Sequence, residues 1–568
     1  MGPGHQGRQR HDPLIKPGGA VPAPADVSTA LFAESLMSWN HSPHATRQPV
    51  LARNLVATSQ PLAAQAGAAA FARGGNAIDA ALAAAITLTV VEPTMNGIGG
   101  DGFALVWDGQ RLHGLNASGR APGGWSPQRF AGMAEMPLRG WESVTVPGMV
   151  AGWAELSERF GALPFEDLFV DAIRYARDGF PISPVIARQW SDAVAELGSH
   201  PGFDAFMPGG RAPRTGELWR FADQARTLEE IAQTRGAAFY EGRLAEAITA
   251  FASAHGAALS LADLRDHRCD WVEPIGIGFR GHTVHEIPPN GQGIAALMAL
   301  GLLEHLPYEE TAPGSAARMH LEIEAMRVAF ADLHAHVADA QHMRVTPAQL
   351  LDTAYLRERA RGIDPRRRGE HAPGQPPEGG TVYLCTADSD GRMVSYIQSN
   401  YRGFGSGVVV PGTGIALHNR GSGFVTTAGH PNEVGGGKRP MHSIIPAFMT
   451  RDGQPVMAFG VMGGNMQAQG HVQMVMRHLV EGLDPQSCVD VPRWRINDAN
   501  ALTIEPVEAA VIESLRAMGH EPKLAARDSL DFGSAQLIAR LEADRVGGAE
   551  PVYAGGSDRR RDGIAVGI

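Results

Sequence analysis

The segment that carries the most structural information is GTVYLCTADSDGRMVSYIQSNYRGFGSG, which runs from Gly380 to Gly407. Its first residues, Thr381–Cys385, are predicted to form an amphipathic strand. Asp388–Gly391 has the composition of a tight turn, and Met393–Gln398 is typical of the returning strand. The segment is therefore predicted to form a β-hairpin that begins at a threonine.

The character of the chain changes on the two sides of this hairpin. Residues 148–365 are predicted to be mostly helical, whereas the chain after residue 380 is rich in predicted strands, including a second hairpin from Ile444 to Phe459. Between the two parts, Asp364–Gly380 is polar and contains four prolines, which indicates an exposed, irregular linker. Gln467–Leu479, after the second hairpin, is predicted to be a helix.

The part before residue 148 has its own clear signals. Ala63–Arg73 is Ala-rich and is followed by Gly74-Gly75, which predicts a helix and its end. Asn76 is a typical N-cap for a second helix, from Ala77 to about Thr89. A hairpin is predicted over residues 103–116, with its turn at Asp108-Gly109.

Thr381 stands at the junction between the linker and the β-rich part. If the chain were cut between Gly380 and Thr381, the threonine would have both a nucleophilic hydroxyl and a free α-amine. A primary amine near neutral pKa can accept the hydroxyl proton, so one residue would supply nucleophile and base. The same hydroxyl can attack the Gly380 carbonyl, and a glycine there tolerates a strained backbone. The junction therefore favours a self-processing enzyme.

The order of motifs along the chain resembles that of the gamma-glutamyltranspeptidase family, whose members are N-terminal nucleophile hydrolases with a threonine nucleophile. The resemblance covers roughly residues 50–568 and includes the segment after Gly380. The matching motifs are Gly74–Asp79, Glu92-Pro93, Gly97–Gly100, Gly102-Phe103, Val146–Gly148, Lys438–Pro440, Ser443, Pro446, Gly463-Gly464, Gly482–Asp484 and Pro492-Arg493.

The resemblance implies an α+β fold, a four-layer αββα N-terminal nucleophile hydrolase sandwich formed jointly by a large and a small subunit. One precursor would cleave itself between Gly380 and Thr381. The expected parts are a disordered tail over residues 1–35, a large subunit over 36–380 and a small subunit over 381–568. The two subunits would form a heterodimer, and a dimer of heterodimers is one possible assembly.

The resemblance also implies a catalytic set. Thr381 would be the nucleophile, and Ser399 stands where the family has a second hydroxyl that supports it. Gly463 and Gly464 match the pair whose backbone N–H groups hold the oxyanion. A donor placed there lowers the barrier by about 2.7–4 kcal/mol. No cofactor and no metal are expected.

The expected substrate-binding residues depart from the pattern of family members that act on glutathione. Ser118 stands where those members have an arginine for the α-carboxylate, and Arg120 lies two residues on. Arg420 and Gly423 stand where they bind the α-amine. The other substrate-binding candidates are Asn400, Tyr401, His442 and Ser443. These departures fit a subgroup that includes gamma-glutamyltransferase-like enzymes, cephalosporin acylases and oxamate amidohydrolase.

Composition limits the classes of function. The 568 residues have a formal net charge of −11, so nucleic-acid or anionic-membrane binding is not expected. The longest nearly apolar run, Ala80–Val91, is shorter than the about 20 residues of a membrane span, and we expect a cytoplasmic protein. The three cysteines show no zinc spacing. A dinucleotide loop at Gly97–Gly102, a calcium loop at Asp388 and a metal pair at His334/His336 are all disfavoured by their context.

The leading hypothesis is a gamma-glutamyltransferase-like amidohydrolase that acts on a small-molecule amide. Thr381 would form an acyl-enzyme from a γ-glutamyl or related amide, which water or an acceptor amine then resolves. Two alternatives stay open: an amidase or acylase for another dicarboxylic monoamide, of the glutaryl-cephalosporin or oxamate type, and a non-catalytic relic of the fold. The sequence leaves hydrolysis versus transfer undecided.

Overall fold

Strands from both sides of the Gly380/Thr381 junction build the centre of the protein. The computed structural model describes residues 1–2, 39–371, 380–497, 500–526, 529–542, 548 and 550–568. The tail expected over 1–35 therefore lies outside the described residues apart from 1–2, as does most of the linker after residue 371. Residues 39–568 form a single unit.

Two seven-stranded sheets hold the described strands that matter for the site, and neighbouring strands in each run antiparallel. The first sheet has the order β1 (Val50–Ala52), β20 (Tyr553–Ser557), β19 (Ser534–Arg540), β15 (Gln454–Met462), β14 (Ala447–Arg451), β9 (His282–Glu286) and β8 (Ile275–Phe279). The second has the order β21 (Ile564–Gly567), β2 (Leu55–Thr58), β10 (Gly380–Ala387), β11 (Met393–Tyr401), β3 (Asp101–Trp107), β4 (Leu112–Ala117) and β7 (Asp270–Val272).

The predicted hairpin is the β10–β11 pair, in the middle of the second sheet. β10 pairs with β2 through Leu384↔Thr58, and with β11 through Leu384↔Tyr396. β11 then pairs with β3. Both sheets thus combine strands that precede residue 380 with strands that follow it. A cut between Gly380 and Thr381, at the start of β10, would leave the two chains joined by these pairings.

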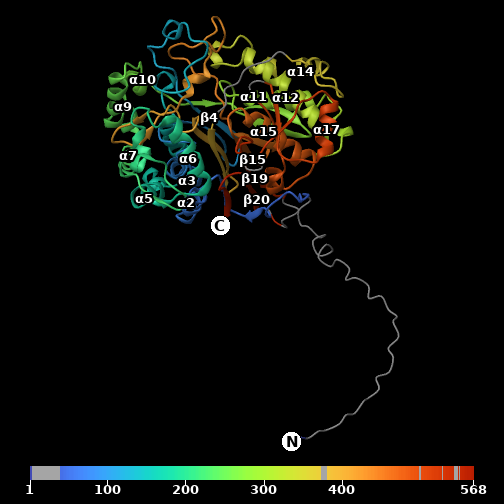
Figure 1. The fold of residues 1–568 in the computed structure, drawn as a ribbon, viewed down its shortest axis with the longest axis horizontal. Coiled ribbons are helices and arrows are strands. Elements are labelled where there is room, and N and C mark those ends of the chain that lie inside the picture. The colour runs from blue at the N-terminus through green and yellow to red at the C-terminus, as the bar shows by residue number, and fades with distance from the viewer. Residues whose placement is uncertain (3–38, 372–379, 498–499, 527–528, 543–547, 549) are drawn as a thin grey trace. The chain divides into compact units, whose positions relative to one another are not determined.

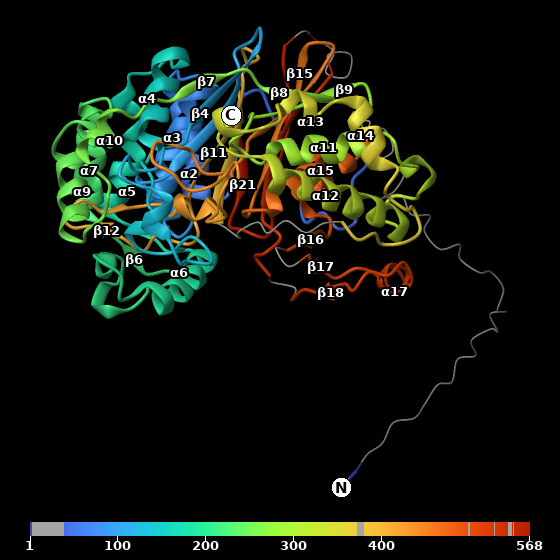
Figure 2. The same cartoon turned by 90° about the horizontal axis from the view of Figure 1, so that it is seen from above.

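The two sheets face one another across a shared apolar core. Tyr383, Cys385 and Ile397 of the second sheet and Phe448 and Ile538 of the first belong to one buried cluster. Helices cover the other face of each sheet, and Figure 2 shows the strands between helices on both sides. Mixed helices and sheets of this kind give the α+β class, as expected.

The helices divide between two further apolar clusters. The helices that share a core with the second sheet are α2 (Pro61–Ala72), α3 (Ala77–Val91), α4 (Met149–Phe160), α5 (Val170–Asp178), α6 (Pro184–Leu197), α7 (Ala222–Gln233), α8 (Ala237–Tyr240), α9 (Arg243–Ala254) and α10 (Leu261–Arg265). Those that share a core with the first are α11 (Gly293–Leu303), α12 (Ala316–His336), α13 (Pro347–Leu350), α14 (Thr353–Ala360), α15 (Met466–Val475), α16 (Pro485–Asp490) and α17 (Ala509–Ala517). Figure 1 shows the two sets on opposite sides of the strands.

Local signals predicted several elements well and missed others. Asn76 caps α3 with a capping box formed with Asp79, as its residue type indicates. The stretch predicted to be mostly helical, however, contains β7, β8 and β9. β7 and β9 pair with β4 and β14, which are remote in sequence, whereas β8 and β9 form a local hairpin that the sequence analysis missed. The helix predicted over 467–479 is α15 followed by one π-helical turn, Met476–Val480.

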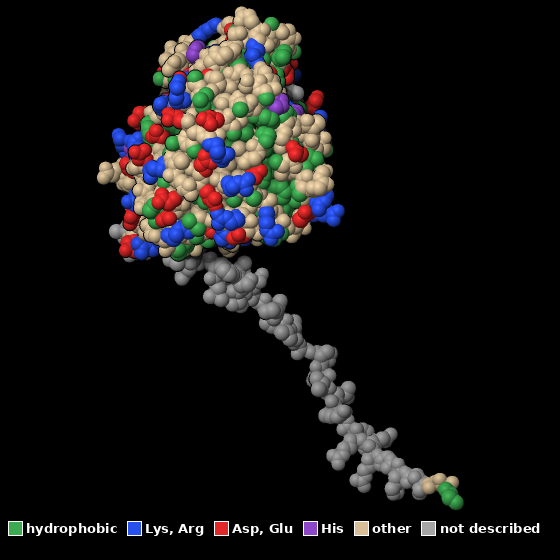
Figure 3. All heavy atoms as spheres, turned by 90° about the vertical axis from the view of Figure 1, so that its left-hand side faces the viewer, with side chains coloured by type: hydrophobic (Ala, Val, Ile, Leu, Met, Phe, Trp, Pro, Cys, Tyr) green, Lys and Arg blue, Asp and Glu red, His purple; other side chains and the backbone are tan. Residues whose placement is uncertain are grey.

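Charges are mixed over the surface that Figure 3 shows, where Lys and Arg side chains lie among Asp and Glu side chains. Among the described residues, none of the helices combines the length and the apolarity that crossing a bilayer requires.

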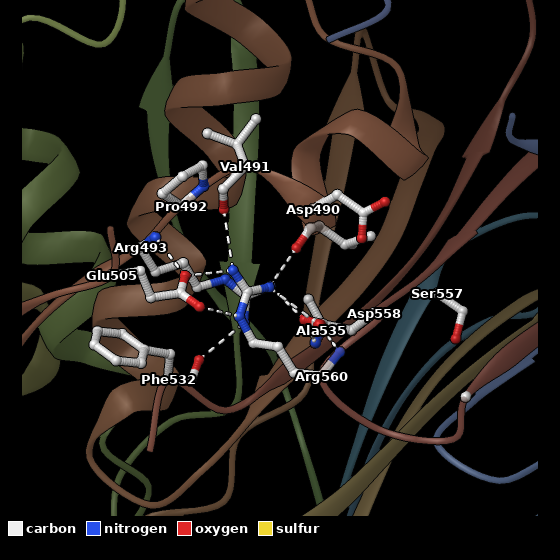
Figure 4. Close-up of polar contacts among 12 residues, drawn as sticks. Asp490, Val491, Pro492, Arg493, Glu505, Phe532, Ala535, Ser557, Asp558 and Arg560 are labelled. Carbon is white, nitrogen blue, oxygen red and sulfur yellow. Dashed lines mark hydrogen bonds and ion pairs between the residues drawn. The ribbon is translucent and has the colours of Figure 1, made fainter. Parts of the chain in front are cut away.

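A buried network of charges fixes the C-terminal segment against the first sheet (Figure 4). Arg493 pairs with Asp558 at 2.6 Å, and Arg560 pairs with Asp558 at 3.0 Å and with Glu505. The two arginines also donate to backbone oxygens, including those of Phe532 and Val489. Because Arg493 and Asp558 are fully buried, each charge depends on its partner for the solvation that water would supply.

We expect Asp558→Asn to lower the free energy of unfolding by about 3–5 kcal/mol at pH 7, because it leaves two buried guanidinium groups short of an anion. Denaturant titration at a fixed protein concentration measures this. The matched control is Glu513→Gln, which removes one partner of the exposed Arg516–Glu513 pair and should change stability by less than about 0.5 kcal/mol. Equal effects of the two substitutions would contradict the role of the network.

The same network predicts a pH dependence. Burial alone would raise the pKa of Asp558, but Arg493 and Arg560 lower it from 3.8 to about 2. A carboxyl group with a lowered pKa stabilises the fold above its unfolded pKa and loses this effect as the pH falls through its folded pKa. The stability difference between the wild type and Asp558→Asn should therefore shrink between about pH 4 and pH 2.

Candidate active site

Thr381 lies at the start of β10 and is fully buried. The register between β10 and β11 shifts at this residue: Gly380 pairs with Tyr401 and Val382 with Gln398, so Ser399 and Asn400 stand opposite Thr381. Such a bulge changes the direction of nearby side chains. Thr381 and Tyr383 lie two residues apart on one face of β10, and Tyr383 belongs to the core between the sheets.

Gln467, near the start of α15, approaches the threonine hydroxyl. Its Nε2 donates to Thr381 Oγ1 at 3.1 Å, and its Oε1 accepts from the Ile445 N–H at 3.0 Å. The second contact fixes which end of the amide faces the threonine. Thr381 Oγ1 is therefore the acceptor in this contact. The hydroxyl proton of Thr381 is not used in it and can be donated to another group.

Ser399 occupies the neighbouring position on β11. Its Oγ accepts a hydrogen bond from the Tyr401 N–H at 2.6 Å. Tyr401 has a φ of 77°, a conformation that non-glycine residues rarely adopt. The serine hydroxyl thus sits at the tight bend where β11 ends, beside the bulge that contains Thr381.

Gly463 and Gly464 connect β15 to α15. Their φ values are 120° and 62°, which favour glycine at both positions. A Cβ on Gly463 would lie 2.8 Å from the Gly533 Cα atom, so the backbone packs too closely there for any side chain. Gln292 donates to the Gly464 and Ser443 carbonyl oxygens, at 2.9 and 2.5 Å, and ties the glycine pair to the segment that contains Ser443.

Arg420 is 2 % exposed, and its guanidinium points inward. Its Nη1 donates to Ser443 Oγ at 2.9 Å, and its Cζ lies 4.5 Å from the centre of the Tyr401 ring. Neither Nε nor Nη2 has a hydrogen-bond partner among the described residues. Burial lowers the pKa of Arg420 to about 10, which leaves it a cation at neutral pH.

The carboxylate of Asp101, the first residue of β3, contacts two buried histidines, His442 and His418. It contacts His442 Nε2 at 3.2 Å and His418 Nε2 at 3.7 Å, and it accepts from the Gly119 and Gly148 N–H groups. Burial alone would raise the pKa of Asp101, but the two imidazoles and Arg420 hold it well below its usual range. Burial lowers the pKa of His442 to about 3, and Arg420 acts in the same direction. His442 is therefore a neutral imidazole oriented by a carboxylate.

Two of the residues predicted to bind substrate, Arg120 and Asn400, make side-chain contacts with groups other than Thr381, Arg420 and Ser443. Arg120 pairs with Asp339 at 3.4 Å and with Asp270 at 3.7 Å. The Asn400 side chain donates to the Ala416 carbonyl at 3.3 Å and packs against the glycine loop at Gly97–Gly100. Their roles as substrate ligands stay predictions.

A pocket of about 210 Å³ has Gly463 in its wall. Three of its lining side chains are arginines and one is an aspartate, so the pocket is predominantly cationic. Its lining is Met95, Arg402, Gly463, Asn465, Met466, Arg495, Ile496, Asn497, Leu530, Asp531 and Arg561.

Three residues of this arrangement were missed in the sequence: Asp101, Gln292 and Gln467. Position could have indicated two of them, since Asp101 lies inside the glycine motif and Gln467 lies three residues after Gly464. The residue type of Gln292 and Gln467 gave no such signal, because buried side-chain amides more often hydrogen-bond to backbone groups. Together, these groups can activate a hydroxyl, bind an oxyanion and hold an anionic end of a substrate.

Comparison with known proteins shows the family to which the chain belongs. A sequence profile described as Gamma-glutamyltranspeptidase matches residues 63–568. The chain is 34% identical over 526 residues to the Glutathione hydrolase-like YwrD proenzyme of Bacillus subtilis (strain 168), covering 91% of this chain and 98% of that protein. It is 35% identical over 523 residues to the Oxamate amidohydrolase proenzyme of Klebsiella pneumoniae, covering 89% and 97%.

A solved structure is also similar to this chain along nearly its whole length. The crystal structure of cephalosporin acylase from Bacillus halodurans superposes with a TM-score of 0.85 at 44% identity, over 98% of this chain and 99% of that chain. The family match spans most of the chain, and these relatives match it over nearly their whole lengths. This chain therefore belongs to the gamma-glutamyltranspeptidase family.

Proposed function

We propose that this protein is a self-processing amidohydrolase whose nucleophile is Thr381, and that its preferred acyl group ends in a carboxylate. On this proposal the two facing sheets and their outer helices are the four-layer αββα sandwich of N-terminal nucleophile hydrolases. Residues 36–380 form the large subunit and residues 381–568 the small one. The observation that carries the proposal is the inward guanidinium of Arg420, two of whose nitrogens have no partner among the residues that the structure describes.

Maturation uses the threonine hydroxyl. Thr381 Oγ attacks the Gly380 carbonyl carbon, the peptide C–N bond breaks, and the Thr381 nitrogen takes the proton as it becomes an amine. Water then hydrolyses the ester between Gly380 and Thr381 Oγ. The products are a carboxylate at Gly380 and a free α-amine at Thr381.

The same two groups then serve the substrate. The α-amine accepts the proton as Thr381 Oγ attacks the amide carbonyl, and it returns the proton to the leaving amine. The Gly463 and Gly464 N–H groups stabilise the oxyanion. Water, or an acceptor amine, resolves the acyl-enzyme and restores Thr381.

Arg420 and Ser443 bind the carboxylate at the far end of the substrate's acyl group. A guanidinium cannot accept a hydrogen bond and repels an ammonium group, but it binds a carboxylate through paired N–H groups. A dicarboxylic monoamide has a carboxylate and no ammonium, whereas a γ-glutamyl group has both. Oxamate is such a monoamide, and one relative is named for it. The alternative is a γ-glutamyl substrate, which the relative named Glutathione hydrolase-like supports.

Purified protein should migrate on denaturing gels as two chains of about 40 and about 20 kDa, in proportion to 380 and 188 of 568 residues and 60.3 kDa. N-terminal sequencing should find Thr381 at the start of the smaller chain. Thr381→Ala should stay as one chain because the nucleophile is gone, whereas Thr381→Ser keeps a hydroxyl and should still be cut. Two bands from Thr381→Ala would show that a foreign protease makes the cut.

We expect Ser399→Ala to slow maturation and to lower kcat by a factor of about 10 to 1000, because a hydroxyl beside the nucleophile is lost. Time courses of chain cleavage and single-substrate kinetics measure the two effects separately. Ser399→Thr keeps the hydroxyl and serves as the control. Wild-type rates in Ser399→Ala would remove Ser399 from the mechanism.

The wild type should have a higher kcat/KM for glutaryl amides than for γ-glutamyl amides with the same leaving group. Arg420→Gln should reduce this preference about 10- to 100-fold, mainly through KM, if Arg420 binds ground state and transition state equally. The parallel variant Arg120→Gln separates the two arginines and should leave the preference in place. A wild type that prefers γ-glutamyl amides, with no change in Arg420→Gln, would refute this assignment.

A further inference from the structure

A second cluster of polar side chains lies at α12, outside the contacts described for Thr381. His320 and Glu324 are one turn apart on this helix and are fully buried. His520, which follows α17, reaches His320 with its ring: His520 Nε2 lies 2.7 Å from His320 Nδ1. Ligand atoms of His320, Glu324 and His520 all lie within 4.8 Å of one another.

A fourth side chain, His371, contacts the cluster through Glu324. His371 Nε2 lies 3.0 Å from Glu324 Oε2, and the His371 side chain is 12% exposed. The Gly369 N–H also donates to Glu324 Oε2 at 2.8 Å, which brings the segment before residue 372 onto α12. The four residues thus come from three separate parts of the chain, and three of the four are completely or almost completely buried.

The outer contacts of the cluster resemble those around protein-bound metal ions. His320 Nε2 is 2.8 Å from the Asp364 carbonyl oxygen, so Nε2 carries the proton, and the lone pair of Nδ1 faces His520 Nε2. Metal-binding histidines commonly donate their second N–H to a backbone carbonyl in this way. Arg327 donates to Glu324 Oε1 at 2.8 Å, which holds the carboxylate and leaves Oε2 on the side of His371.

We propose that His320, Glu324 and His520 bind one divalent transition-metal ion, zinc being the best match, with His371 hydrogen-bonded to the Glu324 carboxylate beside it. Two imidazoles and a carboxylate suit tetrahedral Zn²⁺ rather than Mg²⁺ or Ca²⁺, which prefer sets of oxygen ligands. Water would complete the four-coordinate shell. With Zn–N distances of about 2.0–2.1 Å, the His320 and His520 nitrogens would move apart by about 0.6 Å on binding, a shift that side-chain torsions supply.

The site would join the two proposed subunits, a point that rests on the proposed cleavage. His320, Glu324 and His371 precede residue 380, and His520 follows it. The Arg368 N–H donates to the Met518 carbonyl at 2.8 Å, so the two segments already meet beside the cluster. Residues of α12 and α17 contact one another, and Figure 1 shows the two helices near each other. A bound ion would pin α12 of the large subunit to the small one.

The test is metal binding by the whole purified protein, stripped with a chelator and titrated with Zn²⁺ alone. We expect one equivalent per chain in competition with a chromophoric chelator. Co²⁺ in place of Zn²⁺ should give the visible absorption of a tetrahedral ion. His520→Gln and Glu324→Gln should weaken binding by at least about 100-fold, since even outer contacts contribute 10- to 100-fold. His334→Gln, on the same helix outside the cluster, is the matched control and should bind as the wild type does.

Several results would overturn the site. They are a stoichiometry near zero in the wild type, the absence of a tetrahedral Co²⁺ spectrum, or equal binding by wild type and His520→Gln. The Co²⁺ spectrum of the wild type decides the question even if a variant fails to fold. The uncut Thr381→Ala chain should bind zinc equally well, so zinc binding and cleavage can fail independently. If the protein both binds zinc and cleaves itself, removing zinc should lower the denaturant concentration at which the two chains separate.

Discussion

The pairing of β10 on both of its edges is the constraint on which the active site depends. β10 is hydrogen-bonded to β2 on one side and to β11 on the other, so its first residues cannot move without disturbing the middle of a seven-stranded sheet. This fixes Thr381 between Gln467 and the bulge at Ser399. Because β2 precedes residue 380 and β11 follows it, the pairing that positions the nucleophile would also hold the two chains together after a cut.

Buried charge is the second organising feature. Asp101 and Arg420 are both buried, and the Asp101 carboxylate contacts His442 and His418. In a low dielectric each charge is costly unless it is paired or hydrogen-bonded. Within the described part of the chain, Arg420 Nε and Nη2 have no hydrogen-bond partner, and on our proposal a substrate carboxylate would satisfy them. The Arg493–Asp558 network differs in this respect, since its charges are already paired and serve the fold.

The two proposals use different parts of the same architecture. The proposed nucleophile, Thr381, stands at the start of β10 in the second sheet, whereas the His320 cluster lies among the helices that cover the first sheet. The cluster receives Gly369 and His371 from the segment that leads towards residue 380. An ion bound there would hold Glu324, and through it Gly369 and His371 at the end of the large subunit, without contact with the reacting atoms.

Residue type and local spacing, which a single chain displays directly, determined the hairpin that begins at Thr381 and the capped helices α2 and α3. The order of motifs determined the family, and the resemblance to it supplied the candidates Ser399, Gly463 and Gly464 beside Thr381. The sequence could not show the pairing of β7 and β9 with remote strands, or the contacts of Gln467 and Gln292 with the site. Only the tertiary structure decided that Arg420 points inward while Arg120 pairs with Asp339. It also decided that His520 meets a histidine 200 residues away. Side-chain direction and long-range contact follow from packing, which sequence spacing does not encode.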